Sequence, residues 1–153
     1  MKKKSNIAHG RPLNFLETFF HRRLLKSPSR KPSSLQKRID SKIALSLSEW
    51  VENEGYCSSE DGLEEVALGI GISKEQLAYY FRTRVGVPFT RWRVELRIRK
   101  AKRLLVSCPR MSVKAVGEAV GMPDKSNFRK IFRLQTGFTP SEWRERHSRR
   151  IGF

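Results

Sequence analysis

The sequence predicts an all-α protein in which two similar helical units share one long connector helix. Apolar residues recur at helical spacing through most of the chain, and no segment shows the convincing alternation of a strand. A pattern of small, apolar and glycine residues also repeats after about 50 residues. With 153 residues, the chain has room for one ordinary domain or for two small units on a shared helix.

Residues 1–38 predict a flexible basic arm, because they hold 11 Lys and Arg residues and one acidic residue. Prolines punctuate this arm, and residues 27–34 have the composition of a linker. Apolar residues at helical spacing predict a short amphipathic helix within it: Leu13, Leu16, Phe20 and Leu24. This helix either packs loosely on the domain or frays, or it docks to a partner or a membrane surface.

The first unit is predicted over residues 39–87 and begins with a helix from about residue 39 to residue 54, ended by Gly55. The apolar stripe of this helix consists of Ile43, Leu47, Trp50 and Val51. A helix of this length, with one apolar stripe, is expected to cover one side of a small core.

Two shorter helices are expected to follow in the first unit. Apolar residues from Leu63 to Ile70 indicate a helix that stops near Gly71. Residues 73–76 (SKEQ) have the pattern of a capping box, which opens the next helix. Gly86 closes this helix, so it spans about residues 73–85.

The connector helix is predicted over residues 88–107, because no Gly or Pro interrupts the chain from Phe89 to Ser107. About 20 residues of α-helix extend over roughly 30 Å. The helix carries one apolar stripe near its start and another further along: Phe89, Trp92 and Leu96, then Ile98, Ala101, Leu104 and Leu105. Two stripes at different positions are expected of a helix that contacts two separate cores.

The second unit is predicted over residues 108–148. Ser112 caps its first helix, and a turn at residues 121–124 leads to a helix of about residues 125–136, which ends at Gly137. A last helix, followed by a tail at 149–153, starts with the cap residues Thr139, Pro140 and Glu142.

Each unit supplies the parts of a helix-turn-helix. This motif needs a small residue where its helices cross, a glycine that reverses the chain and an apolar residue that seats the second helix. The units provide, in that order, Ala67, Gly71 and Leu77, and Gly117, Gly121 and Phe128. The sequence therefore predicts two helix-turn-helix subdomains joined by a connector long enough to hold recognition helices about one DNA turn, roughly 34 Å, apart.

Charge is divided unevenly along the chain, whose formal net charge is +17. Residues 39–65 hold one base and eight acids, whereas residues 66–153 hold 20 bases and six acids. A basic field of this kind attracts polyanions, and neutralising phosphates gives strong, salt-sensitive binding to nucleic acid. An anionic membrane surface is the competing interpretation of the same charge.

Residues 97–105 (RIRKAKRLL), 119–128 (AVGMPDKSNF) and 136–144 (TGFTPSEWR) resemble the DNA-binding domain of the AraC/XylS family of bacterial transcription regulators. The resemblance covers about residues 39 to 147, and residues 39–148 are taken as an AraC-type DNA-binding domain. Departures from the usual residues are Trp92 and Trp143 for tyrosine, Gly117 for alanine and Met122 for phenylalanine. The resemblance implies a cytoplasmic, nucleoid-associated regulator that binds specific double-stranded DNA, with activation through RNA polymerase favoured over repression.

The resemblance also implies that the second helix of each unit reads bases. Base-reading positions are expected at Glu75, Ala78, Tyr79, Ser126, Asn127 and Lys130. Phosphate contacts are expected at Gln76, Arg82, Arg84, Lys125, Arg129 and Arg133. A glutamate accepts from cytosine, an asparagine pairs with adenine and a tyrosine packs on a thymine methyl group. Each of these side chains equally fits a solvated helix face.

Several other prominent side chains are interpreted as structural. Inward-facing residues of the two second helices are expected at Leu77, Phe81, Phe128, Ile131 and Phe132. Core aromatic residues are expected at Tyr80, Trp50, Trp92 and Trp143. Ion pairs or solvated charge are expected for the connector residues Arg97, Arg99, Lys100 and Arg103.

No catalytic site, metal site or cofactor is predicted. Cys57 and Cys108 lack the spacing and neighbouring histidines of a zinc site, and the three histidines lie in the arm or near the tail. This composition disfavours an enzyme, although modules of this family occur fused to a DNA-repair methyltransferase. No run of about 18 apolar residues is present, so a soluble intracellular protein without stable membrane association is expected.

The remaining alternative is a nucleic-acid-binding or protein adaptor module without transcription activation. Because 38 residues are too few to form a sensing domain, no small-molecule ligand is expected, and the chain is interpreted as a stand-alone regulator. Both reading heads lie in one chain, which favours a monomer on an asymmetric DNA site.

Overall fold

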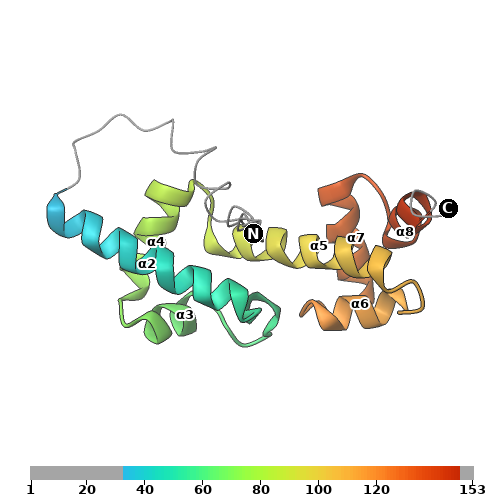
Figure 1. The fold of residues 1–153 in the computed structure, drawn as a ribbon, viewed down its shortest axis with the longest axis horizontal. Coiled ribbons are helices and arrows are strands. Elements are labelled where there is room, and N and C mark those ends of the chain that lie inside the picture. Colours follow the sequence, from blue (N-terminus) through green and yellow to red (C-terminus); the bar gives the residue numbers. More distant parts are fainter. Residues whose placement is uncertain (1–32, 149–153) are drawn as a thin grey trace, which may run out of the picture.

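The computed structural model describes residues 33–148, which form seven α-helices and contain no strand. This confirms the predicted all-α class. Figure 1 shows α5 running through the middle, with α2, α3 and α4 around one end and α6, α7 and α8 around the other. The helix predicted within the arm and the tail at 149–153 lie outside the described residues. Within 33–148, no helix is long and apolar enough to cross a membrane.

Helix α2 (Ser34–Glu52) begins earlier than predicted, since the sequence interpretation placed residues 34–38 in the arm. Ser33 is its N-cap, and the side-chain oxygen of Ser33 accepts a hydrogen bond from the backbone N–H of Gln36 at 3.1 Å. The predicted end is also corrected: the chain reverses at Glu54, which has φ 57°, and not at Gly55. Gly55 instead opens a single 3₁₀ turn, η1 (Gly55–Cys57), and lies against the indole ring of Trp50.

The first helix-turn-helix consists of α3 (Leu63–Ile70) and α4 (Lys74–Tyr80), as predicted. Gly71 reverses the chain between them with φ 75°, a conformation that glycine adopts without strain. Both hydrogen bonds of the predicted capping box are present: Ser73 Oγ accepts from Gln76 N, and Gln76 Oε1 accepts from Ser73 N. The helix continues into a π-helical turn, η2 (Phe81–Val85), and ends at Gly86.

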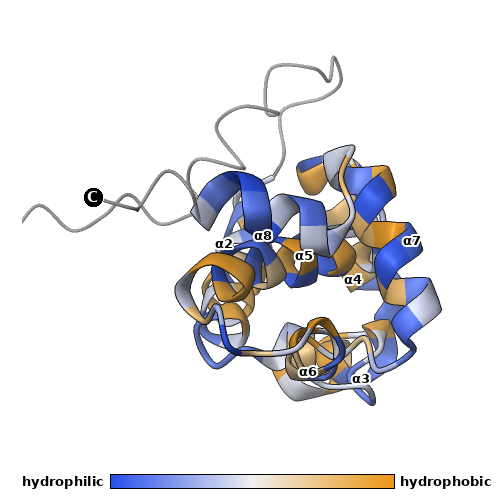
Figure 2. Cartoon of the chain, turned by 90° about the vertical axis from the view of Figure 1, so that its right-hand side faces the viewer, coloured by the Kyte–Doolittle hydropathy of each residue, from blue (hydrophilic) through white to orange (hydrophobic). Residues whose placement is uncertain are grey.

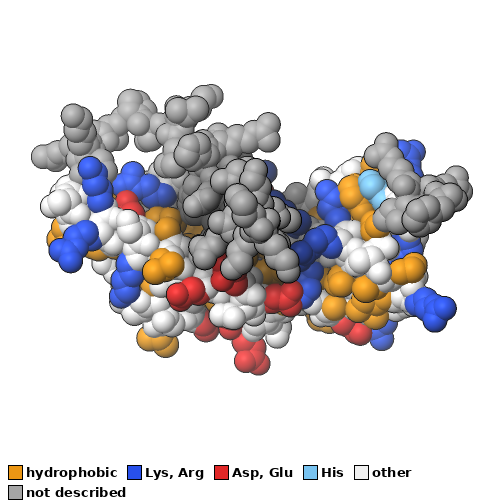
Figure 3. Space-filling model, viewed as in Figure 1, with side chains coloured by type: hydrophobic (Ala, Val, Ile, Leu, Met, Phe, Trp, Pro, Cys, Tyr) orange, Lys and Arg blue, Asp and Glu red, His pale blue; other side chains and the backbone are white. Residues whose placement is uncertain are grey.

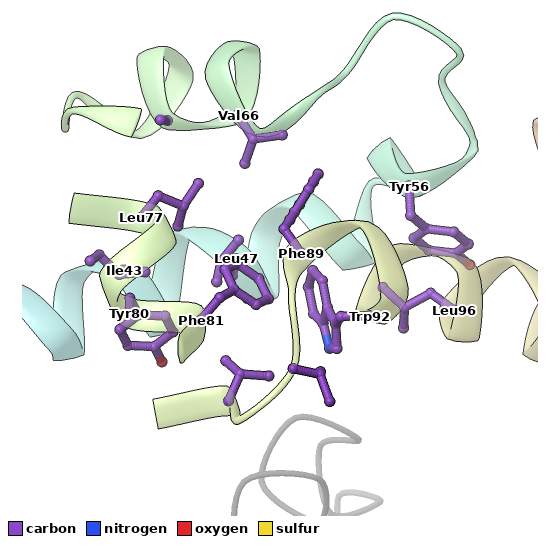
Figure 4. Close-up of a cluster of buried hydrophobic side chains, with 13 residues drawn as sticks. Ile43, Leu47, Tyr56, Val66, Leu77, Tyr80, Phe81, Phe89, Trp92 and Leu96 are labelled. Atoms are coloured by element: carbon purple, nitrogen blue, oxygen red, sulfur yellow. The ribbon is translucent and has the colours of Figure 1, made fainter. Parts of the chain in front are cut away.

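The first core lies between α2, the first helix-turn-helix and the start of α5 (Figure 4). It is strongly aromatic, with Trp50 stacked on Trp92 at a ring-centroid distance of 5.9 Å. The ring of Phe81 packs at an angle against Trp92 at 5.2 Å and against Phe89 at 5.4 Å. Each large aromatic side chain buries more area than an aliphatic one, so these rings are important to the stability of this small core.

Helix α5 (Phe89–Ser107) is the predicted connector, and its 19 residues extend over roughly 30 Å. Its two apolar stripes enter different cores, which confirms the sequence interpretation. The first core receives Phe89, Trp92 and Leu96. The second receives Ile98, Ala101 and Leu105, with Leu104 only partly buried. One helix therefore belongs to both units.

The second helix-turn-helix consists of α6 (Val113–Ala119) and α7 (Lys125–Thr136). Ser112 caps α6 as predicted, and the carboxylate of Asp124 caps α7 by accepting from the backbone N–H of Asn127. Gly121 turns the chain between the two helices, with φ 73°. A Cβ on Gly117 would lie 2.8 Å from the Met122 carbonyl oxygen, so the close approach of α6 to this turn explains glycine in place of the usual alanine.

The final helix, α8 (Pro140–Ser148), packs against the C-terminal end of α5. Thr139 and Glu142 form the predicted capping pair, with Thr139 N donating to the Glu142 carboxylate at 2.7 Å. Hydrogen bonding from the backbone N–H and the side chain of Thr139 to this carboxylate lowers the pKa of Glu142. The Arg144 guanidinium donates to the Leu105 and Met111 carbonyl oxygens at 3.1 and 2.6 Å, which holds α8 on the second unit.

Candidate nucleic-acid interface

The outer face of α7 is strongly basic. Its six predicted DNA-contact residues are all exposed: Lys125, Ser126, Asn127, Arg129, Lys130 and Arg133. Phe128 and Phe132 on the opposite face are fully buried in the second core, whereas Ile131, predicted to be buried, is only partly so. Figure 2 shows α7 at the rim of the molecule, mostly in the hydrophilic colour. The buried phenylalanines thus fix which side of α7 faces outward.

Helix α4 presents a different set of side chains. Glu75, Ala78 and Tyr79 are exposed as predicted, while Leu77 and Phe81 are buried. Tyr79 is 45% exposed. Hydrogen bonds from its own backbone N–H and from Ser73 lower the pKa of Glu75, so this carboxylate is ionised at neutral pH and acts only as an acceptor.

Three of the residues predicted to contact phosphate on this unit have structural contacts of their own. Arg84 pairs with Asp40 of α2 at 2.7 Å, and the two side chains are 28% and 16% exposed. Gln76 is engaged through Oε1 in the capping box. The Arg82 guanidinium lies 5.5 Å from the centre of the Tyr79 ring but remains exposed. The phosphate roles of Arg84 and Gln76 stay predictions, and an Arg84 contact would require the Asp40 ion pair to open.

Of the connector cations, Lys100 forms an ion pair as expected, whereas Arg97 is buried against backbone carbonyl oxygens and so differs from the expected ion pair or solvated charge. Arg97 is buried, and its Nε and Nη2 donate to the Tyr56 and Ser58 carbonyl oxygens at 2.6 and 2.7 Å. Burial, with a smaller effect of the neighbouring Arg93, lowers the pKa of Arg97 to about 10, so the side chain is still a cation at neutral pH. Lys100 pairs with Glu54. The sequence identifies these cations, but it does not indicate that they bind the segment that follows α2 in the first unit.

The four aromatic residues that are predicted to be in a core do lie in or against the two cores, but they are buried to different extents. Trp92 and Tyr80 are buried in the first core, and Trp50 is partly buried against it. Trp143 is partly buried against the second core, where its ring stacks on His147 at 3.9 Å and lies 4.3 Å from the ammonium of Lys102. All four aromatic residues thus lie in or against one of the two cores.

Charge separates on the surface as it does along the sequence. In Figure 3, acidic side chains gather in the lower middle of the visible face, where α2 ends and α3 lies, and Lys and Arg occur to either side. The acidic residues of this region are Glu49, Glu52, Glu54, Glu60, Asp61, Glu64 and Glu65. Helix α7, in contrast, carries four Lys and Arg residues and no acidic residue. A polyanion is therefore attracted to α7 and repelled by the end of α2.

The recognition helices share one side of the connector. In Figure 2, α4 and α7 both lie to the right of α5, whereas α3 and α6 lie below it. Among residues 33–148, no three His, Cys, Asp or Glu side chains lie close enough together to hold a metal ion. Both units therefore have the same three parts, which are an exposed helix, a supporting helix and a glycine turn between the two helices.

A family model described as a helix-turn-helix domain matches residues 66–146, which is more than half of the chain. The chain belongs to this family. The resemblance to AraC-type regulators is confirmed, because the arabinose operon regulatory protein of Escherichia coli is 35% identical over 92 residues. That match covers 60% of this helix-turn-helix protein and 31% of the relative, so the chain spans about a third of the length of such curated relatives.

Solved structures give the same fold. The DNA-binding domain of AdpA, crystallised with a target DNA, has a TM-score of 0.63 at 24% sequence identity. The match covers 71% of this chain and 95% of the AdpA domain. An AraC-type transcriptional regulator from Chromobacterium violaceum has a TM-score of 0.63 at 23% sequence identity. That match covers 73% of this chain and 96% of the regulator's chain. The helix-turn-helix family and the two-unit architecture predicted from the sequence are therefore established.

Proposed function

We propose that the chain is a sequence-specific, double-stranded-DNA-binding transcription regulator that inserts α4 and α7 into successive major grooves. The observation that carries this proposal is that both helices present exposed outer faces on one side of α5. The connector length of roughly 30 Å approaches the roughly 34 Å that separates successive major grooves on one face of DNA.

The two helices contribute differently in this proposal. In α7, Ser126, Asn127 and Lys130 contact bases, while Lys125, Arg129 and Arg133 hold phosphates on either side. In α4, base contacts come from Glu75, Ala78 and Tyr79, and Arg82 in the following turn, η2, holds phosphate. Because α7 has more free cations, we expect the second unit to supply most of the affinity and the first unit to refine sequence choice.

The proposal extends to the mode of action. Activation through contact with RNA polymerase follows from the family resemblance, and a single chain with two reading heads acts as a monomer without a small-molecule ligand. The proposal includes a non-enzymatic role on the nucleoid, where the DNA ligand lies. The competing function is a nucleic-acid or protein adaptor that binds without activating transcription, and the exposed, cation-rich face of α7 favours a nucleic acid over a protein in that case as well.

Selection of bound duplexes from a random library tests the proposal. We expect a two-part consensus, and Asn127→Ala is expected to relax specificity at one position by about 1–3 kcal/mol. Arg129→Ala is expected to weaken binding to all duplexes alike and to reduce the dependence of log Kd on log salt by about one unit. Gln135→Ala, which removes an exposed amide two turns beyond Asn127 on α7, is the matched control and should leave the consensus unchanged.

Competition separates the alternatives. If single-stranded RNA displaced the protein from a selected duplex as readily as the same duplex did, groove reading would be excluded. A random library that returned no consensus, together with an unaltered profile for Asn127→Ala, would favour an adaptor role instead.

A further inference from the structure

The loop between α2 and α3 is held by arginines of the connector. Arg97 binds the Tyr56 and Ser58 carbonyl oxygens through Nε and Nη2. One turn earlier on α5, Arg93 donates to the Ser58 carbonyl oxygen at 3.1 Å and also to that of Asp61. Two guanidinium groups thus bind three backbone carbonyls, so the loop is fixed to α5 through atoms that every sequence of this loop would supply.

The same loop reaches the second unit. A Cβ on Gly121 would overlap the carbonyl group of Cys57 and would lie 3.1 Å from Nη2 of Arg97. Gly121 is the residue that turns the chain between α6 and α7, so a backbone group of the first unit lies directly against the turn of the second helix-turn-helix. Arg97 lies at this junction, bound to the loop on one side and adjacent to Gly121 on the other.

We propose that Arg97 is a positioning residue that fixes the second helix-turn-helix relative to the first and thereby makes DNA binding dependent on the spacing between the two half-sites. Helix α5 alone sets how far apart the units lie, but the direction in which α7 points also depends on how α6 and its turn sit against the first unit. The junction of Arg97, the loop and Gly121 supplies that second constraint. The inference rests on the proposed function.

The geometry of DNA makes this constraint measurable. One additional base pair moves a half-site by roughly 3.4 Å along the axis and rotates it by roughly 35°. Two units held rigidly cannot follow such a change without losing contacts, whereas two units joined only by a helix can adjust. A rigid junction therefore predicts one preferred spacing, and a loosened junction predicts tolerance of several.

Arg97→Lys is the informative variant. It keeps the positive charge, so the long-range attraction to DNA is unchanged, but an ammonium lacks the planar fork that binds two carbonyl oxygens at once. Arg91→Lys is the matched control, because Arg91 lies on the same helix, is 62% exposed and pairs only weakly with Glu95 at 3.4 Å. The same chemical change is thus made inside and outside the junction.

The first measurement needs no DNA. Nitroxide labels replace the exposed Leu68 of α3 and Leu134 of α7, in a background of Cys57→Ser and Cys108→Ser, and pulsed electron paramagnetic resonance gives their distance distribution. We expect one narrow distribution for the parent protein and for Arg91→Lys, and a distribution about twice as wide for Arg97→Lys. An unchanged width in Arg97→Lys would overturn the inference even if the protein binds DNA as proposed.

The second measurement uses a duplex selected by the parent protein, with one base pair inserted or deleted between its two half-sites. Parent and Arg91→Lys are expected to lose affinity about tenfold or more, and Arg97→Lys about threefold or less. An equal loss in all three proteins would refute the role of Arg97. Failure of the parent to select a two-part duplex would refute the proposed function, while the distance measurement would still test the junction. If Arg97→Lys does not fold, Arg93→Lys, which loosens the same loop, takes its place in both experiments.

Discussion

Replacing Phe128 with alanine is expected to lower the free energy of unfolding by about 3–5 kcal/mol, the usual range for a fully buried phenylalanine. Phe128 is 0% exposed at the centre of the second core, with its ring 5.8 Å from that of Phe132. Gly117 of α6 approaches the same ring so closely that a Cβ there would lie 3.2 Å from it.

The loss is expected to appear in urea denaturation followed by circular dichroism, as a lower midpoint with a similar slope. Leu134→Ala on the same helix is the control, because Leu134 is 77% exposed and its removal should change stability by no more than about 0.5 kcal/mol. A Phe128→Ala variant within about 1 kcal/mol of the parent would mean that the second core is not built around this ring. DNA binding should fall with stability, because Phe128 seats α7.

Local sequence patterns predicted the elements that depend on local chemistry. The capping box at Ser73 and Gln76 and the turn at Gly71 arise from residues within a few positions of one another. The two cores on α5 follow from apolar residues spaced along one helix. The same kind of argument placed the start of α2 too late. Ser33 matches the composition of the linker around it, yet its side chain caps the helix.

Contacts between residues that are far apart in the chain could not be predicted from local sequence patterns. Asp40 and Arg84 are 44 positions apart, and nothing in the local pattern of either residue indicates the ion pair. Arg97 was recognised as structural, yet its ligands are backbone carbonyl oxygens, which are the same for every residue type. The exposed positions of α4 and α7 could be predicted because the buried phenylalanines and leucines leave only one face free.

Gly121→Ala is expected to be the most damaging single-methyl substitution at the glycine turns, at about 2–5 kcal/mol of unfolding free energy. Two effects add at this position. A left-handed conformation, with φ 73°, costs an alanine about 1–2 kcal/mol. The new Cβ would also overlap the carbonyl of Cys57, and because both groups are attached to backbone, relief requires the two units to move apart, at about 1–3 kcal/mol.

Gly137→Ala separates these two effects. Gly137 has nearly the same backbone conformation, with φ 79°, but within residues 33–148 no heavy atom outside its own neighbours lies within 4 Å of the position that its Cβ would take. Its substitution should therefore show the conformational cost alone, about 1–2 kcal/mol, in the same urea titration. If both variants lost equal stability, the approach of the Cys57 carbonyl to Gly121 would contribute nothing, and the two units would be coupled through α5 only. A larger loss for Gly121→Ala gives, by difference, the steric cost of the new methyl group against the Cys57 carbonyl.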